Sequence, residues 1–176
     1  MGIRVHCART DNAAPRMSDE RVRHLLELQK RAFGASPWHS VLGALEGITE
    51  SVFFHKPANH SGFPWMDGSI CNIVYHLTGD KLVQCSSAFD NGEVTWDNLT
   101  ISRTDMPTMF KELTNADEVV ASHLSKQTNE SLSNKVKGWG GKSLSIDGLF
   151  LMLIEHDLYH AGQIRFARNL IEPRND

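Results

Sequence analysis

Two histidines four positions apart stand near the end of the chain, in the stretch EHDLYHAGQIR at residues 155–165. If this stretch is helical, His156 and His160 lie on one face, with Cβ atoms about 5–6 Å apart. One metal ion can bridge two imidazoles at that separation. The spacing therefore suggests a metal site and raises the question of which side chain completes it.

Apolar residues of the same segment place both histidines on its buried stripe. Leu149, Leu153 and Ile164 recur with the two histidines at steps of three or four, the period of one helix face. A single histidine on such a stripe is usually a hydrogen-bonded core residue. Burying two side by side without partners costs about 1–3 kcal/mol each, and a shared cation removes that cost. On the pair alone, both a core role and a metal-binding role stay open.

A catalytic metal normally needs a third protein ligand. Seven other histidines are available. His6 lies in the N-terminal segment and His24 adjoins two arginines. Three more lie at a helix start or in a loop: His39, His55 and His60. His76 and His123 remain, and the mid-helix position of His76 favours it, because helix bundles build metal sites between facing helices.

The elements expected to position these residues are helices. Apolar residues at helical spacing and capping residues predict helices at 18–34, 37–48, 69–89, 107–124 and 145–169. Ser18 is the expected cap of the first helix. Loops are predicted at 55–68 and 90–106, and a turn at 137–143, with no strand and no internal repeat. Four or five antiparallel helices of this kind predict a bundle.

Length and composition fit one domain. A chain of 176 residues can bury a real core and is short for two independent domains. Residues 1–17 are polar and aperiodic, so we expect a flexible N-terminal tail followed by a single helical domain over 18–176.

Charge, cysteine content and hydropathy exclude several classes of protein. The net charge of -3, with dispersed Lys and Arg, gives no basic stripe for nucleic acid. Three cysteines without a CxxC pair indicate neither a disulfide framework nor a thiolate zinc site. The N-terminus lacks a signal-peptide pattern and no apolar run is long enough to cross a membrane, which predicts a cytoplasmic protein with no membrane partner.

Two segments together carry a family resemblance. SICNIVYHLTGD at 69–80, followed by LIEHDLYHAGQIRFAR at 153–168, resembles the DinB-like superfamily, which includes the DinB and YfiT groups of metal-dependent hydrolases. The shared features are a Ser-Ile helix opening, a His-Leu pair within that helix, and a late H-D-x-x-H-x-G-Q pattern. With the PWHSVLGALEGITES stretch included, the resemblance covers about residues 36–170.

This resemblance implies an all-α fold, an up-down four-helix bundle to which 18–34 adds an N-terminal helix. It also implies one divalent metal ion, zinc or nickel in relatives, held by three histidines. These carry over to His76, His156 and His160, and all three are present.

Other motifs with a late histidine pair fit less well. HDLYH differs by one methylene from the HExxH of zinc proteases, but no further histidine follows His160 and only sixteen residues remain. An HD-type phosphohydrolase would use His156 and Asp157 as adjacent ligands. It would leave His160 unexplained and would need another late aspartate, for which only Asp176 is available.

Three neutral imidazoles leave the ion its full charge and at least one open position, which lowers the pKa of a bound water or thiol. The resemblance implies transfer of a low-molecular-weight thiol to an electrophilic small molecule. Hydrolysis by an activated water is the alternative, and a non-catalytic, metal-stabilised stress-response module is a third. The thiol must be external, because Cys71 stands about 140° around the helix from His76. A homodimer is compatible with the sequence.

Residues next to the late histidines have two interpretations. Asp157 is the candidate catalytic residue, as a base or as a hydrogen-bonding partner of a ligand, and the alternative is a solvent-facing carboxylate. Gln163 is expected to form a hydrogen bond near the ligands. Gly162 is expected to let a neighbouring helix approach.

Overall fold

Helices make up most of the chain in the computed structural model, which describes residues 19–58 and 67–172. The helices are α1 (Glu20–Lys30), continued by the π-helix η1 (Arg31–Ala35), α2 (Val41–Leu45), α3 (Glu50–Phe53), α4 (Ile70–Phe89), α5 (Met106–Ser125) and α6 (Ile146–Ile171). The predicted all-α class is confirmed. The tail at 1–17, the Ser18 cap, His6 and His60 lie outside the described residues.

Side chains cap the helices that hold the core together. The hydroxyl of Ser69 accepts a hydrogen bond from the backbone N–H of Asn72 at 3.1 Å, at the start of α4. The helix predicted at 37–48 is present but shorter, because Gly47 takes a left-handed φ of 68° just after the end of α2. A separate short helix, α3, follows this segment and is capped by Thr49.

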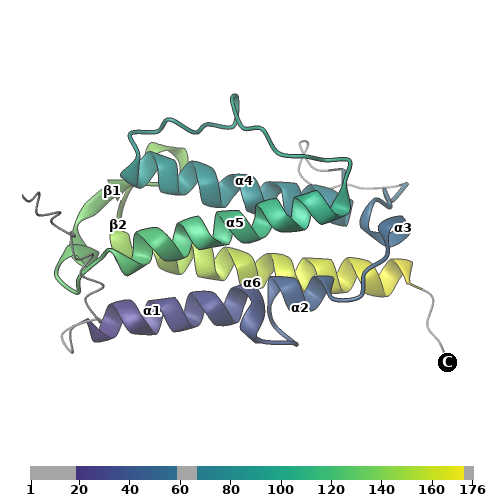
Figure 1. Cartoon of the computed structure of the whole chain (residues 1–176), viewed down its shortest axis with the longest axis horizontal. Helices are drawn as coiled ribbons and strands as arrows, with labels where there is room; N and C mark the ends of the chain where they lie inside the picture. Colours follow the sequence, from purple (N-terminus) through teal and green to yellow (C-terminus); the bar gives the residue numbers. More distant parts are fainter. Residues whose placement is uncertain (1–18, 59–66, 173–176) are drawn as a thin grey trace, which may run out of the picture.

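The long helices lie side by side along the molecule (Figure 1), but their directions do not simply alternate. Near the starts of α4 and α5, the sulfurs of Cys71 and Met109 are 3.7 Å apart. Near the ends of the same helices, Asp90 lies 3.4 Å from His123. α4 and α5 are therefore parallel neighbours, and the antiparallel arrangement predicted for all the helices is wrong for this pair.

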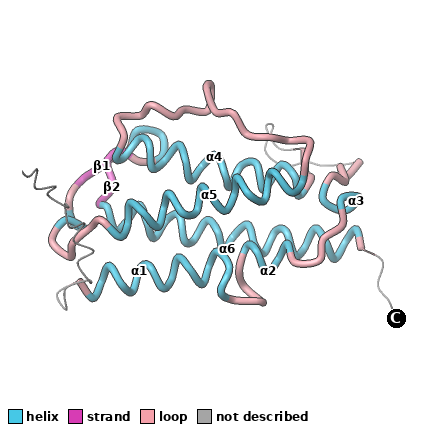
Figure 2. The backbone as a smooth tube through the Cα atoms, viewed as in Figure 1, coloured by secondary structure: helices cyan, strands magenta, loops and turns pink. Residues whose placement is uncertain are grey.

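A long connection makes this parallel pair possible. Figure 2 shows the loop between α4 and α5 running back along the helices, so that α5 starts at the end of the molecule where α4 started. The 20 residues of α4 rise about 30 Å. Residues 90–105, at about 3.3 Å each when extended, can cover that distance. The irregular stretch predicted after α4 is thus a crossover and not a tight turn.

A polar layer divides the core into two apolar clusters. One cluster includes Leu77 of α4 and Ile164 of α6, and the other includes Cys85 of α4 and Leu153 of α6. Between them on three helices lie buried polar side chains: Asp80, Lys81, Gln84, Asp117, Asp157 and His160. The predicted buried stripe of α6 is therefore interrupted at the level of its histidines.

A small hairpin precedes α6, although no strand was predicted. β1 (Lys135–Lys137) pairs antiparallel with β2 (Ser143–Ser145), and the turn between them contains the 3-10 helix η3 (Trp139–Gly141). Another 3-10 turn, η2 (Ser131–Ser133), lies just before β1. Strands of three residues are too short to show an alternating pattern. The predicted turn at 137–143 is thus the tip of a hairpin.

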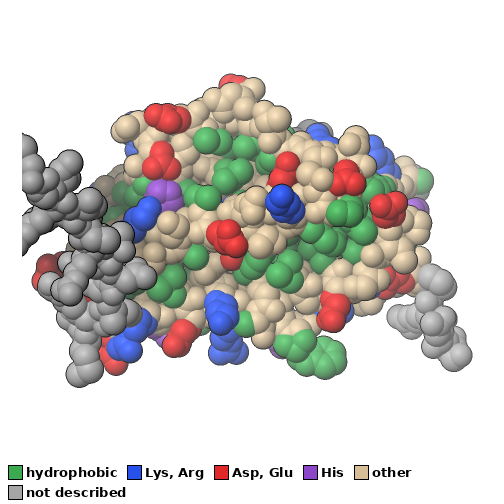
Figure 3. Space-filling model, in the orientation of Figure 1, with side chains coloured by type: hydrophobic (Ala, Val, Ile, Leu, Met, Phe, Trp, Pro, Cys, Tyr) green, Lys and Arg blue, Asp and Glu red, His purple; other side chains and the backbone are tan. Residues whose placement is uncertain are grey.

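The distribution of charged side chains on the surface agrees with the dispersed Lys and Arg of the sequence. On the face shown in Figure 3, acidic and basic side chains are interspersed with exposed hydrophobic ones and form no basic stripe. Within the described ranges, no helix combines the length and apolarity that crossing a bilayer requires.

Candidate metal centre

Three histidines from two helices meet at one point in the polar layer. The Nε2 atom of His156 lies 3.1 Å from Nε2 of His76 on α4 and 2.9 Å from Nε2 of His160 on α6. One ring nitrogen from each histidine lies within 4.8 Å of the others. Ligands held at about 2.0–2.1 Å by a tetrahedral zinc ion would be about 3.3 Å apart. The three predicted ligands are thus brought together, and they could hold a metal ion.

Gln163 fixes which nitrogen of His160 carries the proton. Its Oε1 accepts from Nδ1 of His160 at 2.6 Å, while its Nε2 donates to the hydroxyl of Tyr159 at 2.8 Å. An N–H on Nδ1 leaves Nε2 of the neutral ring with a lone pair. The hydrogen bond predicted for Gln163 near the ligands is therefore present.

Asp80 faces the other ring nitrogen of His156. Its Oδ2 lies 3.3 Å from Nδ1 of His156, long for a hydrogen bond, and that oxygen has no closer partner among the described residues. A proton on Nδ1, facing this carboxylate, would leave Nε2 of His156 with a lone pair as well. Sequence reasoning missed Asp80, although its position four residues after His76 places it on the same face of α4.

With both protons on Nδ1, two lone pairs would face each other across the 2.9 Å between Nε2 of His156 and Nε2 of His160. Two acceptors at that distance repel unless a cation or a proton lies between them. A shared proton would charge the pair inside a largely buried site, whereas a divalent ion binds neutral imidazoles. The arrangement of protons therefore fits a metal ion better than a hydrogen-bonded histidine cluster.

Burial keeps these rings neutral. It lowers the pKa of His156 to about 3, with a further contribution from the neighbouring histidines, and the pKa of His160 to about 4. The pKa of His76 is lowered by the same burial. Burial raises the pKa of Asp80 to about 6, opposed by its hydrogen bond from Gln84 and by the charge of Lys81. At neutral pH the site has three uncharged ligands beside one carboxylate.

Two tryptophans cover the histidines. The indole of Trp96, in the connection between α4 and α5, stacks on the ring of His76. The ring centroids are 5.9 Å apart and the interplanar angle is 8°. The indole of Trp139, at the hairpin tip, meets His156 edge-on at 5.3 Å. Neither was predicted, because residues from loops reach the site only through the crossover and the hairpin.

Asp157 occupies a different part of the polar layer. Its Oδ2 accepts from Nζ of Lys81 at 2.6 Å, and the same ammonium donates to Asp117 on α5 at 3.0 Å. The Lys81 side chain is 2 % exposed. Two carboxylates outweigh the effect of burial and raise the pKa of Lys81. The role predicted for Asp157 at the site stays a prediction, and its contacts here are those of a buried ion pair.

The remaining described histidines lie away from the cluster. His123 pairs with Asp90 and stacks on Phe89 at 4.7 Å. The others are exposed at helix or loop positions: His24, His39 and His55. None of these four described histidines belongs to the group that could hold a metal.

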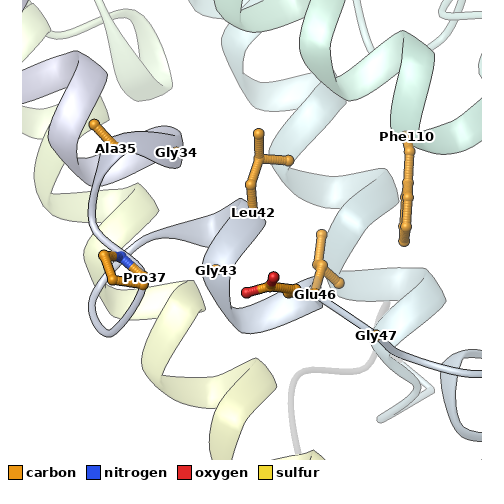
Figure 4. Close-up of a pocket in the computed structure, with 9 residues that line it drawn as sticks. Gly34, Ala35, Pro37, Leu42, Gly43, Glu46, Gly47 and Phe110 are labelled. Carbon is orange, nitrogen blue, oxygen red and sulfur yellow. The ribbon is translucent and has the colours of Figure 1, made fainter.

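A hollow elsewhere in the molecule has no cluster of possible metal ligands in its lining. It has a volume of about 470 Å³ and lies where η1, α2 and α5 meet (Figure 4). Glu46 is the one titratable side chain in its lining, which is otherwise glycine, proline, alanine, leucine and Phe110. No histidine takes part in its walls, so the metal centre is the better candidate for function.

No protein-family model and no curated protein matches the chain. The resemblance to the DinB-like superfamily therefore stays a prediction.

Proposed function

We propose that the protein is a metal-dependent enzyme of the DinB-like type, a four-helix bundle that transfers a low-molecular-weight thiol to an electrophilic small molecule. The observation that carries the proposal is the approach of His156 and His160, whose Nε2 atoms lie 2.9 Å apart. A divalent ion, zinc or nickel, bound by these two residues and His76 would account for that approach.

Access to the site supports catalysis over a purely structural role. His76 forms part of the wall of a pocket, and three protein ligands leave at least one position of the ion open. When bound, the ion supplies Lewis acidity that lowers the pKa of a thiol or water toward neutrality. A thiol starts closer to neutrality, with an ordinary pKa near 8.5, and is therefore the favoured nucleophile.

The chain contributes orientation and exclusion of water. Asp80 and Gln163 hold the ligand rings, and the indoles of Trp96 and Trp139 shield two of them. In the proposed reaction the thiol gives its proton to solvent, and its sulfur forms a bond to an electrophilic carbon. A leaving group such as halide departs with the electron pair of the broken bond.

The described cysteines do not supply the sulfur. Cys71 is buried against Met109, and its thiol pKa is raised by burial. Cys85 is fully buried, which raises its pKa to about 12. Since neither cysteine in the described part of the chain fits this role, the proposal assigns the sulfur to an external thiol.

Metal content tests the site itself. The purified protein should hold about one equivalent of divalent metal by elemental analysis. Replacing His76, His156 or His160 by Ala should each release most of it with helical content preserved by circular dichroism. His123→Ala is the matched control and should keep its metal. Full metal retention in His76→Ala would show that the three-histidine assignment is wrong.

A haloaromatic such as 1-chloro-2,4-dinitrobenzene tests the chemistry. It should be consumed only when protein, metal and a small thiol are all present. The rate should collapse in His156→Ala and largely persist in Cys71→Ser. Equally fast turnover of a nitrophenyl ester without thiol would replace thiol transfer by hydrolysis.

A further inference from the structure

A pocket of about 380 Å³ opens beside the histidines. Its walls come from α4, the crossover and the hairpin tip: Asn72, Tyr75, His76, Trp96, Arg103 and Trp139. The volume lies within the range of about 300–1,000 Å³ typical of small-molecule sites. Three segments far apart in the sequence therefore build one cavity at the metal centre.

The aromatic walls offer flat apolar surface. Trp96 is 40 % exposed and Trp139 is 45 % exposed, although each packs one part of its ring against a histidine. Exposed indole of this kind is usually costly, and a bound aromatic ring would cover it by stacking or edge-on contact. The pocket thus favours a ligand with a planar apolar body.

Arg103 adds a positive charge that the described protein does not neutralise. Its Nη2 donates to Oδ1 of Asn72 at 3.0 Å, and its guanidinium lies 4.2 Å from the ring centroid of Tyr75. These contacts orient the planar group. Among the residues that the structure describes, no carboxylate lies within ion-pair distance of it, and the side chain is exposed.

A guanidinium has five N–H donors, and the Asn72 contact accounts for one of them. Oriented N–H groups that remain available match a carboxylate, which accepts two parallel hydrogen bonds. A neutral ligand would leave the charge uncompensated. The combination of indoles and an oriented arginine therefore selects for a ligand that is both aromatic and acidic.

We propose that this pocket binds a small aromatic carboxylate, with the acid group on Arg103 and the ring against Trp96 and Trp139. The assignment of this ligand as the electrophilic substrate rests on the proposed function, because the pocket wall includes His76. Binding itself does not depend on the metal, since neither the indoles nor Arg103 is a metal ligand in the proposed site.

Calorimetric titration with 2-naphthoate and its neutral isostere 2-naphthamide tests the proposal. The full chain is titrated metal-free, after chelator dialysis, and again with one equivalent of Zn²⁺. Naphthoate should bind more tightly than naphthamide. Arg103→Gln should weaken naphthoate about tenfold and leave naphthamide unchanged, because only the acid uses the charge. Arg23→Gln, at an exposed position on α1, is the matched control and should change neither affinity.

The aromatic walls are tested with the same two probes. Trp139→Leu should weaken both by about threefold to tenfold, whereas Trp38→Leu, at an exposed position outside the pocket, should weaken neither. Equal affinity of naphthoate and naphthamide, or no effect of Arg103→Gln, overturns the proposal even if zinc binds. If zinc fails to bind but the Arg103 effect persists in metal-free protein, the pocket stands and the proposed function falls.

Discussion

At the scale of single residues, the partners of the histidines determine which ring nitrogen faces the site. Oε1 of Gln163 accepts a hydrogen bond from Nδ1 of His160, and Oδ2 of Asp80 lies 3.3 Å from Nδ1 of His156. In known metal sites such partners change metal affinity by about 10–100-fold. The same positions in this protein should therefore control affinity without touching the ion.

Asp80→Asn should weaken Zn²⁺ binding by about tenfold, the lower end of that range, because the amide oxygen can still accept from Nδ1 of His156 while the charge is lost. Competition with a chromophoric chelator measures the affinity. Asp90→Asn, at an exposed aspartate outside the site, should have no effect. Unchanged affinity in Asp80→Asn would remove Asp80 from the description of the site.

Gly79 makes room for Trp96. A Cβ at this position would lie 2.4 Å from Cζ3 of Trp96 and 2.7 Å from Cδ2 of Leu99, so the indole would have to move. Gly79→Ala should therefore increase acrylamide quenching of tryptophan fluorescence, even though alanine is the better helix former by about 1 kcal/mol. Gly162→Ala, with nothing within 4 Å of its Cβ, should stabilise α6 and leave quenching unchanged. If quenching increased in Gly162→Ala but not in Gly79→Ala, Trp96 would not pack on α4.

At the scale of elements, the sequence predicts helices better than it predicts their arrangement. α4 and α6 follow from local signals, the Ser69 cap and the apolar spacing around Leu149 and Leu153. The parallel course of α4 and α5 does not, because it depends on how a loop without periodicity crosses the molecule. His76, His156 and His160 could be chosen from their neighbourhood, whereas Trp96 and Trp139 could not.

The polar layer also escaped prediction, since a single lysine on a helix usually faces solvent. Lys81 instead joins α4 to α5 and α6 through Asp117 and Asp157. Gln29 of α1 donates to Asp117 at 2.5 Å, which ties a fourth helix to the same group. The layer therefore connects four helices, α1, α4, α5 and α6, at the level of the histidines.

Lys81→Met should lower the free energy of unfolding by about 3–5 kcal/mol, because it leaves two buried carboxylates without their cation. Urea denaturation followed by circular dichroism measures the loss. The triple variant Lys81→Met, Asp117→Leu, Asp157→Leu should recover much of it, since the charges are removed together. Lys111→Met, at an exposed position of α5, is the control for loss of a lysine. A loss of unfolding free energy well below this range in Lys81→Met would mean that water reaches the carboxylates of Asp117 and Asp157 in solution.

At the scale of the whole molecule, the three histidines that could hold a metal lie on core helices and not on a surface loop. Two apolar clusters flank the polar layer along the helices. Folding must therefore desolvate the histidines whether or not a metal is present. Protonation of the unfolded chain competes with that burial, which couples the stability of the metal-free protein to pH.

The sign of this coupling follows from the lowered pKa of His156, about 3 in the folded protein against 6.5 in an ordinary environment. Between pH 6.5 and 4 the unfolded chain binds a proton here and the folded protein does not. Neutral His156 thus contributes stability above pH 6.5 that is lost as pH falls, by about 1.4 kcal/mol per pH unit.

Carboxylates with a raised pKa, such as Asp80, oppose the trend but are common to wild type and a His156→Gln variant. As pH falls from 6.5 to 4, the metal-free wild type should therefore lose more unfolding free energy than the metal-free variant. Urea denaturation at each pH measures both values. A pH-independent difference would show that His156 titrates normally and is not buried as described.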